Sequence, residues 1–303
     1  MSSTLERVIT REQYMEEVEK WKRLYLVSHR VSLIPYYGGK YNHVNKYLPY
    51  IYAIMSINKC NTYIEMTGGG ARFLLNLEKE YFKHIIYNEM DLGLCSLFQC
   101  VSSQEYKKLM EILERLEVDK ELFDYAVKDR NNKEIGILRR SILTYISAKQ
   151  SYNANLKQYS SVKDEIFSDN ALHNISRAHE LMKDVVVLNG DFNYLLDRFS
   201  SAKHVIKMID PPYHPATRDS KDNYPCEMTK EQHMELANKF SECRSGLLCG
   251  YDPTSCGCND YKIMEDRGAF KISMGKYPLP SAQGEEGVSG KDKAKEEFIW
   301  VKL

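Results

Sequence analysis

Residues 62–71, Thr-Tyr-Ile-Glu-Met-Thr-Gly-Gly-Gly-Ala, predict a β-strand that runs into a glycine turn and then into a helix over 71–81. The strand covers 62–65, and the three glycines follow it closely. Glycine lets a ligand approach the backbone, and the free N–H groups at the start of a helix can point at that ligand. The stretch therefore predicts a binding turn, although a tight strand–helix connection could use the same residues.

The alternation of strands and helices continues on both sides of this turn. Short apolar runs predict further strands at 84–87, 185–188, 204–209, 246–249, 270–274 and 298–301. Apolar residues at helical spacing predict helices at 11–25, 42–57 and 92–101. This repeated strand–helix order predicts an α/β fold with a parallel sheet and helices on both of its faces.

The strand signal disappears in the middle of the chain. Leucine, isoleucine and tyrosine recur there at helical spacing, in the runs 106–116, 122–127, 135–146 and 172–182. We therefore predict two domains, a sheet domain made of 1–101 with 183–303 and a helical insertion over 102–182. Residues 276–297 carry glycines and lysines that predict a loop or hairpin.

The bulk composition excludes several classes of protein. The chain of 303 residues carries 42 basic and 42 acidic side chains, so a polyanion would have to meet a local patch. We find no signal-peptide pattern and no run of roughly 20 apolar residues that could span a membrane. Eight irregularly spaced cysteines favour a cytoplasmic protein with reduced thiols. Cys243, Cys249, Cys256 and Cys258 suggest zinc, but they lack a paired CxxC, and we predict no metal.

Acidic residues follow the predicted strands at their carboxyl ends. Glu89 comes about 20 residues after the glycine turn, where an acid can accept both hydroxyls of a ribose. Asp191 and Phe192 follow strand 185–188, where they could bond an adenine amino group and cover its ring. A helix N-cap at Asp191 is the alternative. Because ligands of open α/β sheets bind at this edge, the pattern predicts a nucleotide-like site.

A fourth strand end carries Asp210-Pro211-Pro212-Tyr213, directly after strand 204–209. The prolines fix φ and have no N–H group, so the Asp and Pro carbonyls remain available as acceptors. The ring of Tyr213 could lie beside a flat substrate. The tetrapeptide therefore predicts a site that holds a planar ring by its amino group, and a plain proline turn is the alternative.

Five segments, taken in order, resemble the motif series of the Dam-like DNA adenine N6-methyltransferases. They are Tyr36-Tyr37-Gly38-Gly39-Lys40, Glu65-Met66-Thr67-Gly68-Gly69-Gly70, Asn88-Glu89, Asp191-Phe192 and Asp210-Pro211-Pro212-Tyr213. The resemblance implies S-adenosyl-L-methionine (AdoMet) as methyl donor, S-adenosyl-L-homocysteine as product and no metal. It also implies a Rossmann-like methyltransferase sheet with a reversed terminal strand, and a target-recognition domain in the insertion.

The resemblance carries roles over to individual positions. The cofactor contacts that it implies are Tyr36, Tyr37, Gly38, Gly39, Lys40, Glu65, Thr67, Gly68, Gly69, Gly70, Glu89, Met90, Asp191, Phe192 and Asp210. The chain departs from the family pattern at four of its positions. The family commonly has tryptophan at Tyr36, proline and phenylalanine at Met66 and Thr67, and aspartate at Glu89.

The chemistry of an adenine amino group predicts a mechanism for the catalytic motif, Asp210, Pro211, Pro212 and Tyr213. Hydrogen bonds from N6 to the Asp210 carboxylate and the Pro211 carbonyl would free the nitrogen lone pair to attack the sulfonium methyl group. The target base has to leave the duplex, and Tyr213 is the predicted stacking partner. N4-cytosine methylation, adenine methylation of RNA and a non-catalytic DNA-binding relative remain the alternatives.

The partner implied is double-stranded DNA, and the insertion holds the predicted contacts. Six basic residues and one acidic residue lie between 130 and 162, with amide and aromatic groups among them. The predicted DNA contacts are Arg130, Lys133, Arg139, Arg140, Lys149, Ser151, Tyr152, Asn153, Asn155 and Lys157. A solvated basic helix face is the alternative. The sequence leaves open a companion restriction endonuclease, the recognised site and the oligomeric state.

Overall fold

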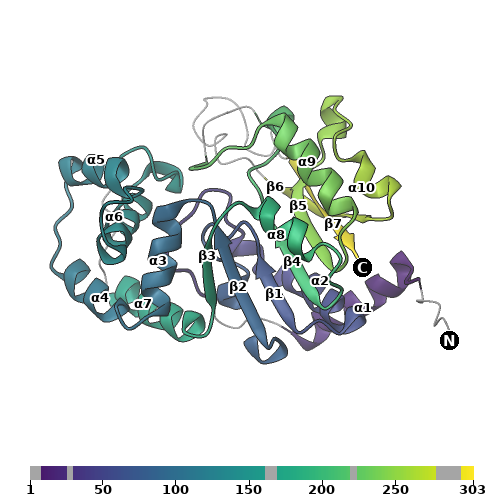
Figure 1. Ribbon diagram of the computed structural model, residues 1–303, viewed down its shortest axis with the longest axis horizontal. Coiled ribbons are helices and arrows are strands. Elements are labelled where there is room, and N and C mark those ends of the chain that lie inside the picture. The colour runs from purple at the N-terminus through teal and green to yellow at the C-terminus, as the bar shows by residue number, and fades with distance from the viewer. Residues whose placement is uncertain (1–7, 26–29, 161–168, 219–223, 278–294) are drawn as a thin grey trace.

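A seven-stranded sheet organises the described part of the chain (Figure 1). The computed structural model describes residues 8–25, 30–160, 169–218, 224–277 and 295–303. The strands are β1 (Thr62–Glu65), β2 (His84–Glu89), β3 (Val186–Asn189), β4 (Val205–Ile209), β5 (Gly246–Tyr251), β6 (Phe270–Tyr277) and β7 (Lys295–Lys302). Their order is β3-β2-β1-β4-β5-β7-β6. Strands β1 to β5 are parallel and β7 is antiparallel to both of its neighbours, which confirms the predicted α/β fold with one reversed strand.

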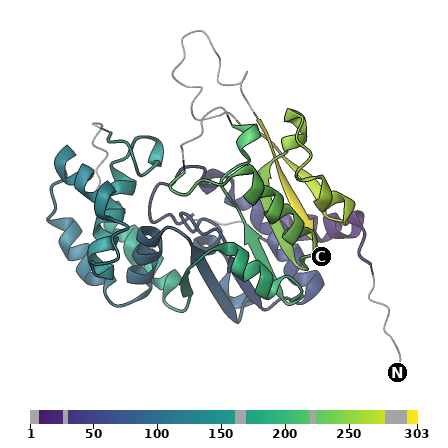
Figure 2. The ribbon, with the colours of Figure 1, turned by 45° about the horizontal axis from the view of Figure 1, so that its top comes forward.

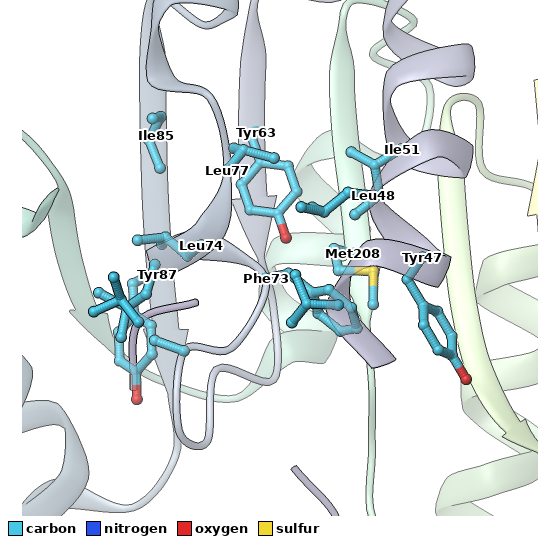
Figure 3. Packing of buried hydrophobic residues seen from close by; sticks show 14 of the residues in the cluster. Tyr47, Leu48, Ile51, Tyr63, Phe73, Leu74, Leu77, Ile85, Tyr87 and Met208 are labelled. Carbon is cyan, nitrogen blue, oxygen red and sulfur yellow. The ribbon is translucent and has the colours of Figure 1, made fainter. Parts of the chain in front are cut away.

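The central strands bury both of their faces, because successive side chains point to opposite sides. On one side, Tyr63 and Met208 pack against Leu48 and Ile51 of helix α2 (Val44–Asn58), as Figure 3 shows. Helix α1 (Arg11–Leu24) packs on α2 and adds Tyr14 to the same core.

On the other side of the sheet, the next residue along each strand turns toward a second helical layer. Ile64 and Ile209 belong to a separate core with side chains of α8 (Phe192–Phe199), α9 (Lys230–Ser241) and α10 (Lys262–Asp266). Figure 1 shows α8 and α9 in front of the sheet. The prediction of helices on both faces is therefore confirmed.

A group of helices lies beyond the β3 edge of the sheet, where Figures 1 and 2 show it in blue and teal. It contains α3 (Leu92–Ser102), α4 (Tyr106–Glu114), α5 (Lys120–Asp129), α6 (Ile137–Lys149) and α7 (Asp169–Met182). Helix α3 packs on both α6 and α7, so it joins this group to the sheet. None of the described helices is both long enough and apolar enough to cross a membrane.

One predicted element is wrong. Residues 71–81 form two short 3₁₀ turns, Leu74–Asn76 and Lys79–Tyr81, instead of an α-helix. Ala71 has a φ of +52°, outside the helical region, and the Leu74 N–H donates to the Glu65 carboxylate at 2.7 Å. The backbone N–H that a helix would use is thus diverted to the end of β1. Of the predicted loop 276–297, residues 278–294 lie outside the described part of the chain.

Candidate active site

A cavity of about 290 Å³ opens at the carboxyl edge of β1, β2, β3 and β4. Sixteen of the residues predicted for cofactor binding or catalysis lie on its wall: Tyr36, Tyr37, Gly38, Gly39, Glu65, Thr67, Gly68, Gly69, Gly70, Glu89, Met90, Asp191, Phe192, Asp210, Pro211 and Pro212. Two predicted residues, Lys40 and Tyr213, are not on that wall. The strand-end motifs thus converge on one cavity, as the parallel topology requires.

The glycine turn after β1 is fixed by two aromatic rings. A Cβ atom at Gly68 would lie 2.1 Å from the Tyr87 ring, and one at Gly69 would lie 2.7 Å from the Tyr36 ring. Gly69 also has a φ of +48°, which favours glycine. Both positions therefore exclude a side chain, and the backbone itself forms this part of the wall.

Two buried carboxyl groups stand at the ends of β1 and β2. Burial raises the pKa of Glu65 to about 8, although hydrogen bonds from the Leu74 N–H and the Tyr63 hydroxyl act to lower it. Burial likewise raises the pKa of Glu89 to about 7, although hydrogen bonds from the Asp91 and Gly69 N–H groups act to lower it. Both groups thus hold protons near neutral pH unless a bound donor or cation favours their charged form.

Asp191 carries out the structural role that the sequence left open. It is the N-cap of α8, and its carboxylate accepts the Asn193 N–H at 2.8 Å. The same residue lies on the cavity wall beside Phe192. The two readings are therefore compatible, because an N-cap at a strand end also faces the carboxyl edge of the sheet.

The catalytic-motif acid lies in a buried group of charges. The Lys40 Nζ is 3.1 Å from Asp210 Oδ2 and 3.2 Å from Glu297 Oε1. Burial lowers the pKa of Lys40, but the two carboxylates outweigh it and hold that pKa well above its usual value. Burial raises the pKa of Asp210, and the Lys40 charge opposes this rise. The Asp210 N–H donates to Thr67 Oγ1 at 2.8 Å, which fixes the motif against the glycine turn.

Glu297 was not among the predicted site residues, because it falls in the segment 276–297 predicted as a loop or hairpin. It lies on β7, where its carboxylate accepts the hydroxyl of Tyr213 and, at 2.6 Å, that of Tyr47. The Tyr213 ring also packs edge-on to Tyr251 at 4.5 Å, and only 7% of Tyr213 is exposed. An acid directly before an apolar strand was the available signal, but its long-range partners could not be read from it.

Further wall residues were not among the predicted site residues, and most of them lie outside the strand-end motifs. They are Met66, Arg72, Phe73, Gly190, Tyr224, Cys226, Glu227, Met228 and Gln232. Tyr224 packs against Tyr37 with ring centroids 5.2 Å apart, and its N–H donates to Glu227. Glu227 also pairs with Arg218 at 2.6 Å. This ion pair holds the segment before α9 over the cavity.

The insertion uses two of its predicted DNA-binding arginines internally. Arg130 is buried and forms a bidentate ion pair with Asp91, the N-cap of α3, at 2.6 and 2.7 Å. Arg140 donates to Ser96 at 2.8 Å and to the carbonyl of Ile135. Arg130 is buried, so its predicted DNA contact is corrected, whereas Arg140 is half-buried and its DNA contact stays a prediction.

The other predicted DNA contacts differ in exposure. Lys133, Arg139, Tyr152 and Asn153 are exposed, Lys149, Ser151 and Lys157 are half-buried, and Asn155 is buried. Arg139 contacts the ring of Tyr125, which leaves it at the surface. The loop that carries Tyr152 joins the cavity, because the Tyr37 N–H donates to the Ala154 carbonyl at 3.1 Å.

A side-chain cluster beside the catalytic motif resembles a metal site. His214, Cys258 and Asp260 place their ligand atoms within 4.8 Å of one another. The Ala216 N–H donates to His214 Nδ1, so Nε2 carries the ring proton and donates to Asp260 at 3.0 Å. To bind a metal, a histidine nitrogen needs a free lone pair, and the other ring nitrogen usually donates a hydrogen bond. In His214, Nε2 carries the proton and Nδ1 accepts a hydrogen bond, so hydrogen bonds account for this cluster. All eight cysteines are free thiols.

The fold and the site define an α/β protein whose ligand cavity lies at the carboxyl edge of its parallel strands. The model of the D12 class N6 adenine-specific DNA methyltransferase family matches residues 36–251, more than half of the chain, and the chain belongs to this family. It is thus an enzyme that methylates adenine in DNA. No curated protein matches it. The matched span includes the whole cavity wall and leaves out Glu297.

Proposed function

We propose that the chain transfers a methyl group from AdoMet to N6 of an adenine that has left duplex DNA, and that Asp210 is the acceptor for the amino group. The observation that carries this proposal is the position of Asp210 and Pro211 on the wall of the cavity that the glycine turn and the strand-end acids also line. Donor site and acceptor site would thus share one cavity.

The residues of the wall fit AdoMet. Glu89 at the end of β2 offers carboxylate oxygens to a ribose, and Asp191 with Phe192 offers an acceptor and a ring to an adenine. Glu65 is a buried carboxyl group that a ligand ammonium group would allow to ionise. When bound, AdoMet supplies a sulfonium-activated methyl group. The chain would supply orientation and the exclusion of water around that group.

Asp210 and Pro211 would act on the target amine. Hydrogen bonds from N6 to the carboxylate and the proline carbonyl favour a nitrogen whose lone pair is free to attack. Lys40 favours the charged form of Asp210, because its Nζ lies 3.1 Å from that carboxylate. Lys40 therefore acts as a positioning residue in this proposal, with Glu297 holding its ammonium from the other side.

The target base would have to be extruded, because its amino group is inaccessible inside a duplex. Stacking on Tyr213 stays a prediction, and the ring would have to move, since only 7% of the residue is exposed. Tyr37 and Tyr224 already lie on the wall with their rings 5.2 Å apart. We propose these two rings as additional contacts for the base.

The insertion would bind the duplex through its exposed basic and aromatic side chains. Lys133 and Arg139 can neutralise phosphates, and Tyr152 with Asn153 lies on a loop joined to Tyr37. That connection supports a path from the DNA surface to the cavity. We therefore propose 102–182 as the target-recognition domain, without Arg130 as a contact.

Incubation with methyl-labelled AdoMet and mixed-sequence duplex DNA, followed by nucleoside analysis, tests the proposal. We expect label in N6-methyladenine, and an RNA duplex of the same sequence should remain unlabelled. Label in N4-methylcytosine or in RNA would replace the proposal by one of its alternatives. Binding of AdoMet and DNA without any transfer would identify a non-catalytic relative.

A further inference from the structure

Arg72 is a buried cation in a cavity whose charged residues are otherwise acidic. It lies on the wall together with Glu65, Glu89, Asp191, Asp210 and Glu227. No other lysine or arginine among the described residues lines this wall. Arg72 is 6% exposed, and a buried charge of this kind is costly without a compensating partner. The cavity therefore contains one positive group, Arg72, that the reaction proposed above does not use.

The protein satisfies this guanidinium only in part. One terminal nitrogen donates to the Ser32 hydroxyl and the other to the Ile34 carbonyl, but the Nε–H has no hydrogen-bond partner. No carboxylate of the described residues pairs with Arg72 at ion-pair distance. Burial lowers the pKa of Arg72 to about 10, so the side chain still carries its charge at neutral pH. Two neutral acceptors and the Tyr41 ring, 5.4 Å from the guanidinium carbon, thus orient a cation that has no ion-pair partner among the described residues.

The chain makes room for this side chain at two glycines of the wall. A Cβ atom at Gly39 would lie 3.1 Å from the Arg72 Nε, and one at Gly70 would lie 3.3 Å from it. Both glycines belong to the segments predicted to contact the cofactor. The guanidinium therefore lies directly beside the backbone that we expect the ligand to approach.

We propose that Arg72 binds the carboxylate of the methionine part of AdoMet, an inference that rests on the proposed use of this cofactor. The methionine part is a zwitterion, and the wall offers it charges of both signs, Arg72 for the carboxylate and Glu65 for the ammonium group. The nucleoside part of the cofactor has no carboxylate. Arg72 therefore makes the site specific for ligands that carry the amino acid.

A purely structural role accounts for less of the geometry. The bonds to Ser32 and Ile34 fix residues 32–34 against the turn after β1, and a neutral side chain could supply such donors. It would not require a permanent charge in a place where burial opposes that charge. The charge and the free Nε–H are the features that a ligand carboxylate explains.

Isothermal titration calorimetry with two ligands tests this inference without a turnover assay. S-adenosyl-L-homocysteine carries the carboxylate, and its decarboxylated form keeps the amine and the nucleoside. We expect the native protein to bind the acid roughly 10- to 100-fold more tightly than the decarboxylated ligand. In the Arg72→Gln variant this preference should fall to less than about threefold, through weaker binding of the acid alone. Arg72→Lys should restore part of the preference, because it keeps the charge.

The outcomes separate this inference from the function on which it rests. If the native protein binds neither ligand nor AdoMet, the proposed cofactor is wrong. If it binds both ligands equally tightly, no cation binds the carboxylate, and the proposed role of Arg72 is overturned. If Arg72→Gln binds both ligands more weakly by the same factor, the proposed role is also overturned, because Arg72 would then act only through packing. If Arg72→Gln does not fold, Arg72→Lys is the test: a preference for the acid equal to the native one would overturn the role of Arg72, and a reduced preference would support it. An unchanged affinity of Arg72→Lys for the decarboxylated ligand would show that its nucleoside site is intact.

Discussion

The strand edge and the helical insertion use their charged side chains in opposite ways. At the edge, Glu65, Glu89 and Asp210 are held by the strands toward a single cavity. In the insertion, Arg130 and Arg140 turn inward and bind the protein itself. Charge in a helical segment therefore does not by itself indicate a binding surface. Parallel strands fix the direction of an end-residue, whereas a helix presents residues all around its axis.

The largest effect is expected at the edge. Asp210→Ala should lower single-turnover methyl transfer by about 1000-fold or more, because the amine loses its charged acceptor. Binding of S-adenosyl-L-homocysteine should change far less than transfer, since Asp210 is only one of its fifteen predicted contacts. Asp252→Ala is the matched control: this acid follows β5, pairs with Lys271 and lies outside the cavity wall. Equal loss of transfer in both variants would show that general destabilisation causes the effect.

The second prediction tests the inward use of charge in the insertion. Arg130→Met should lower the free energy of unfolding by about 3–5 kcal/mol, because it leaves Asp91 as a buried, unpaired carboxylate. Arg139→Met, at an exposed position of α6, should change the same quantity by less than about 1 kcal/mol. Urea denaturation followed by circular dichroism measures both. Similar values for the two variants would remove the distinction that we draw between these arginines.

The third prediction concerns pH and the buried acids of the edge. Folding raises the pKa of Glu65 from 4.5 to about 8 and that of Glu89 from 4.5 to about 7. These two groups therefore bind more protons in the folded state, and their contribution to the free energy of unfolding should fall as pH rises from 4.5 to 8. Glu65→Gln should flatten this dependence while still accepting the Leu74 N–H. A pH dependence that is the same in Glu65→Gln and in the native protein would contradict the raised pKa of Glu65.

The smallest effect is expected for the exposed part of the insertion. Lys133→Ala combined with Arg139→Ala should weaken DNA binding several-fold and reduce the salt slope by about one for each lost phosphate contact. Lys262→Ala with Arg267→Ala, on and directly after α10, provides a control with the same loss of charge far from the insertion in Figure 1. Fluorescence anisotropy over a salt series measures both. If the α10 pair weakens DNA as much, the DNA surface lies elsewhere.

The sequence predicted most of the edge and little of what supports it. The motifs at Gly68–Gly70, Glu89 and Asp210 could be found because strand period and chain order fix where such residues meet. Glu297 could not, since its contacts with Lys40 and Tyr47 join segments from opposite ends of the chain. The helix expected over 71–81 failed for a similar reason. The positive φ of Ala71 and the hydrogen bond that the Leu74 N–H donates to Glu65 override the local helical pattern.

In the insertion, the spacing of apolar residues predicted the helices, but it did not predict which basic residues are buried and which are exposed. Arg130 lies one residue past the last helical residue of α5, and the partner that buries it, Asp91, is the N-cap of α3. No local pattern distinguishes it from Arg139, which follows within the same basic run. Burial of a single charged side chain depends on the packing of α3 against α6, which only the three-dimensional structure reveals.

We propose that the strand edge performs the transfer and that the insertion holds the DNA. Single-turnover methyl transfer over a series of duplex concentrations tests it most directly, for Asp210→Ala and for Lys133→Ala with Arg139→Ala. We predict that Asp210→Ala loses the limiting rate but keeps the duplex concentration at half-saturation. The double variant should keep the limiting rate and need several-fold more DNA. If the insertion variant lost the limiting rate while Asp210→Ala retained it, this division of roles would be wrong.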